Sequence, residues 1–112
     1  MSARRGEVWL VALDPVEGHE QAGRRPALVL SVDAFNASPA ELVTVLPITS
    51  KARALRTRIE VRPPEGGLTA VSYVIGEQTR TISTRRLGKR LGMVSVATME
   101  KVAEVTRVLL GL

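Results

Sequence analysis

The chain has 112 residues, fewer than the roughly 150 typical of one domain, so we expect a single domain over residues 1–112. Hydrophobic residues make up 45% and charged residues 24%, which is typical of a globular protein and excludes a disordered chain. The sequence contains no cysteine and one histidine, so disulfides, zinc–thiolate centres and multi-histidine metal sites are excluded. The longest apolar stretch near the start, residues 8–13, is too short for a signal peptide or a membrane span, so we expect a cytoplasmic protein without membrane contact.

The net charge of +5 is unevenly distributed. Residues 51–92 contain ten Lys and Arg against three Glu, a local charge of +7, whereas the remainder carries −2. A basic stripe of this kind suits a polyanion such as RNA or DNA, or an acidic protein segment. A solvated arginine-rich surface is the alternative interpretation.

Short apolar runs separated by turn residues predict at least five strands. They cover residues 7–13, 26–32, 42–49, 58–62 and 70–75, and residues 78–82 continue the sheet after Gly76. Residues 63–67 (PPEGG) predict a loop. Pro47 cannot donate a backbone hydrogen bond, so we expect it at an edge or a bulge.

The end of the chain changes to a helical period. Apolar residues recur there every three or four positions, with charged residues between them: Met99, Val102, Val105 or Thr106, Leu109 and Leu112. Ser95 is the expected N-cap. Several short strands followed by one helix predict a mainly β fold with a C-terminal helix, arranged as a small curved β-barrel. A β-sandwich is the competing architecture.

Residues 18–31 (GHEQAGRRPALVLS) form the segment richest in reactive side chains. This polar stretch contains an imidazole, a carboxylate, an amide and two guanidinium groups, carried by His19, Glu20, Gln21, Arg24 and Arg25. Loops that a scaffold holds in place often contain functional sites. The alternative is a polar hairpin in which Arg25 caps strand carbonyls or pairs with a carboxylate.

With these residues the sequence resembles the MazF/PemK toxins of bacterial toxin–antitoxin systems, especially their ChpB-like branch. The resemblance is carried by residues 5–9 (RGEVW), 13–15 (LDP), 18–31, 46–49 (LPIT), 76–82 (GEQTRTI) and the terminal helix. It therefore extends over nearly the whole chain. The polar loop followed by the Pro-x-Thr strand end, in this order, is its most specific part.

The resemblance implies a toxin that acts as a sequence-selective, metal-independent endoribonuclease on single-stranded RNA and so inhibits translation and growth. It implies an SH3-like barrel of the CcdB/PemK type, a homodimer, no cofactor, and a MazE-like antitoxin with a flexible acidic tail. The family's key arginine corresponds to Arg25 and its key threonine to Thr49. Glu20 and Gln21 match the family's loop, whereas His19 replaces a serine common in many members.

Metal-free cleavage can use the RNA's own 2′-hydroxyl as the nucleophile, and it requires proton transfer and stabilisation of extra negative charge. Arg25 is suited to stabilising this negative charge, because its planar guanidinium stays protonated and can contact two phosphoryl oxygens. Thr49 can donate a hydrogen bond to a phosphate oxygen. Glu20 is the candidate general base and His19 the alternative, while Glu20 could instead orient Arg25 as an ion pair.

Further residues are candidates for binding RNA: His19, Gln21, Arg24, Ser50, Gln78, Arg80, Arg85 and Arg86. Gln78 and Arg80 either read base edges or hold a strand, and the basic residues from Arg85 to Arg90 bind phosphates or the antitoxin. Three aromatic residues are too few for a base-stacking platform. Two rival functions remain, a non-catalytic RNA-binding module and a gyrase-targeting toxin of the same fold.

Overall fold

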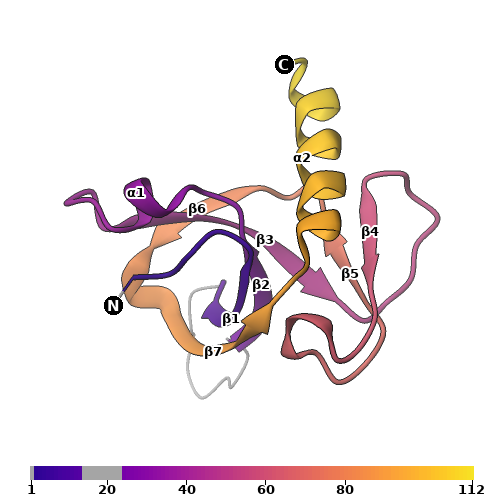
Figure 1. The fold of residues 1–112 in the computed structure, drawn as a ribbon, viewed down its shortest axis with the longest axis horizontal. Helices are drawn as coiled ribbons and strands as arrows, with labels where there is room; N and C mark the ends of the chain where they lie inside the picture. Colours follow the sequence, from indigo (N-terminus) through magenta and orange to yellow (C-terminus); the bar gives the residue numbers. More distant parts are fainter. Residues whose placement is uncertain (1, 14–23) are drawn as a thin grey trace.

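The computed structural model describes residues 2–13 and 24–112, which form a curved antiparallel sheet with one long helix beside it (Figure 1). The strands are β1 (Glu7–Ala12), β2 (Arg24–Val29), β3 (Leu42–Thr49), β4 (Arg58–Val61), β5 (Ser72–Ile75), β6 (Arg80–Ser83) and β7 (Leu87–Met93). The helices are α1 (Asp33–Asn36) and α2 (Val96–Leu110), with short 3-10 turns η1 (Glu65–Gly67) and η2 (Thr84–Arg86). The predicted mainly β fold with a C-terminal helix is therefore confirmed.

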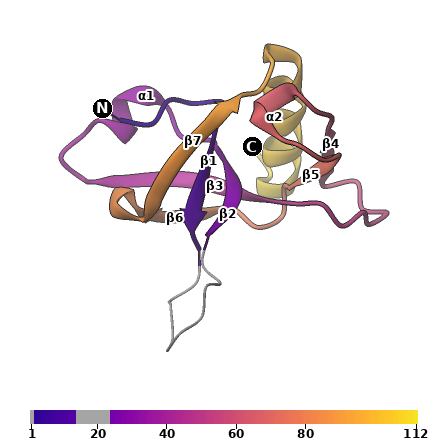
Figure 2. The same ribbon diagram turned by 90° about the horizontal axis from the view of Figure 1, so that it is seen from below.

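The sheet is open. Its hydrogen-bonded order is β4-β5-β3-β2-β1-β7, and β6 pairs with β3 outside this path. Figure 2 shows β7 alongside β1 at one end of the sheet and α2 beside β4 and β5 at the other. The curvature is barrel-like, but β4 and β7 do not pair to close the cylinder.

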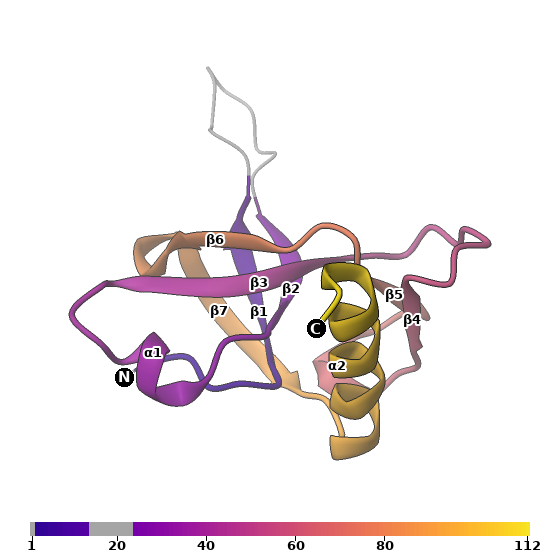
Figure 3. The same cartoon turned by 90° about the horizontal axis from the view of Figure 1, so that it is seen from above.

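Strand β3 is the centre of this arrangement, and Figure 3 shows it crossing the molecule between β6 and β2. One side pairs with β2, while the other pairs with β6 over its first half and with β5 at its end. The expectation that Pro47 lies at an edge or bulge is wrong, because Pro47 is buried and in register with Ala27. On its other side the ladder changes from β6 to β5 between Val45 and Ile48, so Pro47 interrupts neither pairing there.

Helix α2 begins where the sequence predicts. The Ser95 side chain accepts a hydrogen bond from the backbone N–H of Thr98 at 3.1 Å, and Gly111 ends the helix in a left-handed conformation at φ 73°. The first half of α2 packs on the sheet through the fully buried Val102. The predicted apolar face does not stay buried, since Leu112 is 84% exposed where the chain extends past the sheet (Figure 1).

No helix in the described part of the chain is long and apolar enough to cross a membrane.

Strand β7 (LGKRLGM) was missed by the sequence analysis. Its residues show no alternation of apolar and polar side chains, and none of them is fully buried. Its position depends instead on pairing with β1, with two register shifts, and on close contact with η1. A Cβ atom at Gly67 would lie 2.0 Å from the Leu91 carbonyl oxygen, and Gly67 has φ +71°, so only glycine fits there.

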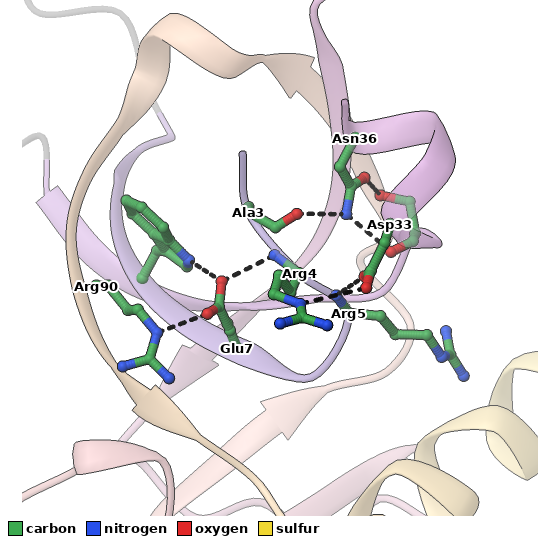
Figure 4. A network of polar contacts seen from close by, with 9 residues as sticks. Ala3, Arg4, Arg5, Glu7, Asp33, Asn36 and Arg90 are labelled. Carbon is green, nitrogen blue, oxygen red and sulfur yellow. Dashed lines mark hydrogen bonds and ion pairs between the residues drawn. The ribbon is translucent and has the colours of Figure 1, made fainter. Parts of the chain in front are cut away.

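A polar network fixes β1 to β7 and to the N-terminal segment (Figure 4). The Glu7 carboxylate is 8% exposed and accepts hydrogen bonds from Arg90 Nε at 2.6 Å, Trp9 Nε1 at 3.0 Å and the Arg4 backbone N–H at 2.8 Å. Burial alone would raise the pKa of Glu7, but these three donors outweigh it and lower the pKa. Glu7 is therefore a stabilising anion at neutral pH.

We expect Glu7→Gln to lower the free energy of unfolding by about 2 kcal/mol, because the amide cannot accept all three hydrogen bonds of a buried carboxylate. Urea unfolding at pH 7 measures this change. The control is Glu60→Gln, since Glu60 pairs with Arg62 at 2.6 Å on the exposed side of β4. An exposed pair of this kind contributes at most about 1 kcal/mol. Equal effects of the two substitutions would contradict the role assigned to the buried network.

Candidate active site

Arg25 and Thr49 come together because β2 and β3 are antiparallel neighbours. Ala27 pairs with Pro47, and continuing that register by two residues places Arg25 opposite Thr49 on the same face of the sheet. Arg25 is exposed and Thr49 is half-buried. The two residues named by the sequence analysis as the catalytic arginine and threonine therefore share one surface.

Two adjoining hollows have Arg25, Ile48 and Thr49 as their common wall. The larger has a volume of about 530 Å³ and the smaller about 300 Å³. The larger is completed by Leu10, Pro26, Ser50, Lys51, Gly67, Leu68, Thr69, Ala70, Ser72 and Leu91. The smaller is completed by Leu13, Pro47, Ile75, Gln78 and Arg80. An extended ligand can thus pass over the Arg25–Thr49 pair with one part in each hollow.

The Thr49 hydroxyl is oriented by the backbone. Its oxygen accepts a hydrogen bond from the Lys51 backbone N–H at 3.2 Å. With one lone pair occupied in this way, the hydroxyl hydrogen points to other acceptors. Thr49 is therefore prepared to donate to an oxygen of a bound ligand.

The charged side chains in the described lining of both hollows are Arg25, Lys51 and Arg80, and none of the described lining residues is acidic. Three cations around a surface with hydrogen-bond donors favour an anionic ligand. Apolar side chains such as Leu10, Leu68 and Leu91 form part of the larger hollow beside them. This combination suits a phosphodiester flanked by aromatic bases.

A family model described as "PemK-like, MazF-like toxin of type II toxin-antitoxin system" matches residues 4–110. The chain belongs to this toxin family. The predicted resemblance to the MazF/PemK toxins is thereby confirmed at the level of the family.

Individual relatives agree with the family assignment. Endoribonuclease MazF9 of Mycobacterium tuberculosis is 37% identical over 114 residues, covering 97% of each chain. Endoribonuclease PemK of Escherichia coli is 42% identical over 100 residues, covering 88% of this chain and 74% of PemK. A MazE–MazF crystal structure from Deinococcus radiodurans superimposes with a TM-score of 0.85 at 29% identity, covering 100% of this chain and 98% of that one.

Other predicted binding residues lie apart from the two hollows. The Arg24 guanidinium lies against β7, where a Cβ atom on Gly88 would come within 2.1 Å of Arg24 Nη1. Arg86 donates from Nη1 to the Ala12 carbonyl oxygen at 2.9 Å, and Arg85 is exposed on η2. None of these three arginines lines either hollow, so the structure does not bring them to Arg25 and Thr49.

Ser50, Gln78 and Arg80 do lie at the hollows. Ser50 is exposed in the larger one, and Gln78 is exposed in the turn between β5 and β6. Arg80 has a second role, because its Nη2 donates to the Leu13 carbonyl oxygen at 2.7 Å. It thereby fixes the end of the described N-terminal segment beside the smaller hollow.

Glu20, the candidate general base, lies outside the described residues, as do His19 and Gln21. The structure therefore neither adds to nor changes their predicted roles.

The basic stripe predicted over residues 51–92 is not a continuous surface. Arg58 and Arg90 each form an ion pair with a glutamate that is itself largely shielded, Glu77 and Glu7 respectively. Lys51, Arg53 and Arg56 are exposed in the segment between β3 and β4, and Lys51 lines the larger hollow. The local charge is thus divided between internal ion pairs and exposed cations beside the site.

The residues that close the larger hollow were not predicted from the sequence. Leu68, Thr69 and Ser72 follow η1 and carry no recognisable motif. The one signal was the pair Gly66–Gly67, because two successive glycines with positive φ allow η1 to approach β7 closely. This approach brings the segment after η1 to the wall opposite Arg25.

Proposed function

We propose that this chain is an endoribonuclease toxin that cleaves single-stranded RNA and thereby inhibits translation and growth. The observation that supports it most is the shared wall of Arg25 and Thr49 between two hollows with a cationic described lining. Membership of the PemK-like, MazF-like toxins and relatives named as endoribonucleases support the same activity. In this proposal the whole chain acts as one catalytic domain in the cytoplasm, where RNA is accessible.

The scissile phosphate lies over Arg25 and Thr49 in this mechanism. Attack by the neighbouring 2′-hydroxyl forms a 2′,3′-cyclic phosphate and releases a 5′-hydroxyl. Arg25 stabilises the additional negative charge on the phosphoryl oxygens, and the Thr49 hydroxyl donates to one of them. The guanidinium of arginine stays protonated at physiological pH, so Arg25 supplies the positive charge that a metal ion would otherwise provide.

Proton transfer is assigned to the segment between β1 and β2. Glu20 is proposed as the general base that accepts the 2′-hydroxyl proton, with His19 as the alternative. The proton is returned to the departing 5′-oxygen, directly or through water, which gives the 5′-hydroxyl. Gln21, Ser50, Gln78 and Arg80 are proposed to bind the bases and phosphates on either side of the cleaved bond. Arg24, Arg85 and Arg86 are proposed to contact RNA that extends beyond the hollows.

A non-catalytic RNA-binding module is less well supported. Binding of RNA without cleavage requires cations. It does not require a threonine hydroxyl beside an arginine in the same hollow. A gyrase-targeting toxin of the same fold is also less well supported, because the relatives reported above are named as endoribonucleases.

We expect Arg25→Ala to lower the rate of RNA cleavage at least about a hundredfold, because it removes a charge contact to the transition state. Thr49→Val should lower the rate less, since a neutral hydroxyl contributes less than a guanidinium. Arg25→Lys should recover only part of the activity, because lysine cannot contact two oxygens in one plane. Cleavage of a labelled RNA in EDTA, resolved on a gel, measures all three rates.

The control is Glu60→Gln, which alters an exposed ion pair on β4 and should leave the cleavage rate unchanged. Near-wild-type cleavage by Arg25→Ala would disprove the proposed mechanism. A larger loss in Thr49→Val than in Arg25→Ala would reverse the order of their contributions.

We propose that the chain forms a homodimer. Apolar side chains are exposed around the start of α2, where Val32, Met93 and Val96 border a hollow of about 590 Å³. A second group lies at the end of α2, at Val108, Leu109, Leu110 and Leu112. Exposed apolar side chains grouped in this way support contact between proteins.

Light scattering at micromolar concentration should give a mass twice that of the 12.1-kDa chain. Val96→Asp places a charge at the first group, and Leu110→Asp places one at the second. At least one of them should shift the mass towards that of a single chain, because burying an unpaired carboxylate is strongly unfavourable. A wild-type mass of one chain would refute the dimer.

We propose that an acidic antitoxin segment competes with RNA for the site. MazF of Deinococcus radiodurans has been crystallised together with MazE. In this chain the exposed Lys51, Arg53 and Arg56 extend from the larger hollow along the segment after β3. A negatively charged peptide on these cations would exclude RNA both sterically and electrostatically.

Titration of the cognate antitoxin tail into a complex of the protein with a non-cleavable RNA should release the RNA. The affinities of the protein for RNA and for the antitoxin tail should both fall as the salt concentration rises. The affinity for RNA should fall more steeply, because RNA also releases condensed counterions. Replacing Lys51, Arg53 and Arg56 with Gln should weaken both ligands. A ternary complex with unchanged RNA affinity would show that the antitoxin acts elsewhere.

A further inference from the structure

Glu77 and Arg58 form an ion pair next to two residues that line the smaller hollow, because Arg58 is in register with Ile75 and Glu77 precedes Gln78. The Arg58 side chain is 6% exposed, and its Nη2 and Nε donate to Glu77 Oε2 at 2.7 and 3.0 Å. The Thr57 hydroxyl donates to Glu77 Oε1 at 2.7 Å. Glu77 therefore accepts hydrogen bonds from two consecutive residues at the start of β4.

The same turn is attached to β4 through its backbone. The Gly76 N–H donates to the Thr57 carbonyl oxygen at 3.0 Å, and the Gln78 N–H closes the turn on Ile75 at 3.1 Å. A Cβ atom on Gly76 would lie 2.4 Å from the Thr57 carbonyl oxygen and 2.9 Å from Val105 Cγ1 of α2. Gly76 is thus confined between the start of β4 and α2, and the turn that follows it is closed by a backbone hydrogen bond.

This confined turn carries Gln78 and leads into Arg80, and both line the smaller hollow beside Arg25 and Thr49. We propose that Glu77 is a positioning residue that holds Gln78 and Arg80 where they select the RNA base next to the cleaved bond. The inference rests on the proposed function, because it names residues that determine the specificity of the same site. Glu77 itself does not line either hollow and acts through its neighbours.

The burial of Arg58 explains why loss of Glu77 would displace the turn that carries Gln78. A buried guanidinium without its carboxylate is unfavourable, so loss of Glu77 forces Arg58 and the turn above it to rearrange. A side-chain amide reads a base by two directed hydrogen bonds and is sensitive to displacement. A shift of the turn therefore reduces discrimination between bases more than it reduces the affinity of phosphate contacts.

The ion pair between Glu77 and Arg58 does not depend on pH near neutrality. Hydrogen bonds from Arg58, helped by Thr57, lower the pKa of Glu77 from 4.5 to about 2 against the opposing effect of burial. Its contribution is complete above pH 4.5 and is lost only as the pH falls towards 2. Glu77 therefore stays ionised and paired with Arg58 near neutral pH.

The test uses the full-length chain and an RNA pool randomised around one cleavage site, with cut ends mapped by sequencing. The kcat/KM of the preferred RNA is then compared with that of RNAs carrying one substituted base. We expect Glu77→Gln to reduce the discrimination at one position about tenfold and Glu77→Ala to reduce it at least as much. If Glu77→Ala does not fold, Glu77→Gln, which keeps the side-chain volume, carries the test.

A double-substitution cycle of Glu77→Gln with Gln78→Ala tests whether Glu77 affects base discrimination through Gln78. If Glu77 acts through Gln78, then Glu77→Gln should cost little further discrimination at that base once Gln78 is replaced. Full additivity of the two substitutions would overturn this route.

Two controls separate positioning from stability. Glu60→Gln alters an exposed pair on β4, so it should leave discrimination unchanged and lower the melting temperature less than Glu7→Gln does. Glu7→Gln should lower the melting temperature without changing discrimination, because Glu7 contacts β7 and the N-terminal segment instead of this turn. An equal loss of discrimination in Glu7→Gln would reduce the effect to general destabilisation and overturn the inference.

The remaining outcomes distinguish the two proposals. If the wild type cleaves selectively and Glu77→Gln keeps its full discrimination, the inference is wrong while the proposed function stands. If the wild type cleaves every sequence equally, there is no selection for Glu77 to support, and the inference also fails. If the wild type cleaves no RNA, the proposed function itself fails.

Discussion

The antiparallel register between β2 and β3 is the constraint on which the candidate site depends. Side chains alternate between the faces of a strand, so a slip of one residue would turn Thr49 away from Arg25. The register is fixed by buried residues just inside the site, where Ala27, Leu28 and Val29 of β2 oppose Pro47, Leu46 and Val45 of β3. The hydrophobic core therefore sets the geometry of two polar residues that it does not contain.

Around this central pair of strands, buried or half-buried carboxylates attach the outer segments to one another. Glu7 connects β1 to β7 through Arg90, and Glu77 connects the β5–β6 turn to β4 through Arg58. Glu65 performs a similar function in η1, where it accepts hydrogen bonds from the Ser95 N–H at 2.9 Å and the Thr98 hydroxyl at 2.6 Å at the start of α2. None of these three carboxylates lines either hollow, and the charged side chains in the described lining are all cations.

The sequence predicted strongly patterned elements well. Residues 42–49 form β3 with the predicted bounds, and Ser95 caps α2, because short apolar runs and capping residues are local signals. Strand β7 could not be predicted, since Leu-Gly-Lys-Arg-Leu-Gly-Met is held by pairing with β1 and by the approach of η1. Tertiary contacts of this kind leave no periodic signal.

The residues of the candidate site were predictable from the sequence to about the same extent as the strands and helices. Arg25 and Thr49 were named from motif and resemblance, and the strand register brings them to one face. The orientation of Arg24 away from the hollows follows from strand alternation, but only once the bounds of β2 are known. The burial of Arg58 was not predictable, because a charge count treats every arginine alike whether it faces solvent or a carboxylate.

The lowered pKa values of the structural carboxylates also constrain how cleavage can respond to pH. Hydrogen bonds received from backbone and side-chain donors keep Glu7, Glu65 and Glu77 ionised at neutral pH. Each therefore contributes to stability above its ordinary pKa, and the contribution declines only as the pH falls through the lowered value. The framework is consequently constant above these ordinary values, across the range in which a general base with an imidazole pKa titrates. A change in cleavage rate over that range thus reports the groups that transfer protons, and not a rearrangement of the strands that hold Arg25 and Thr49.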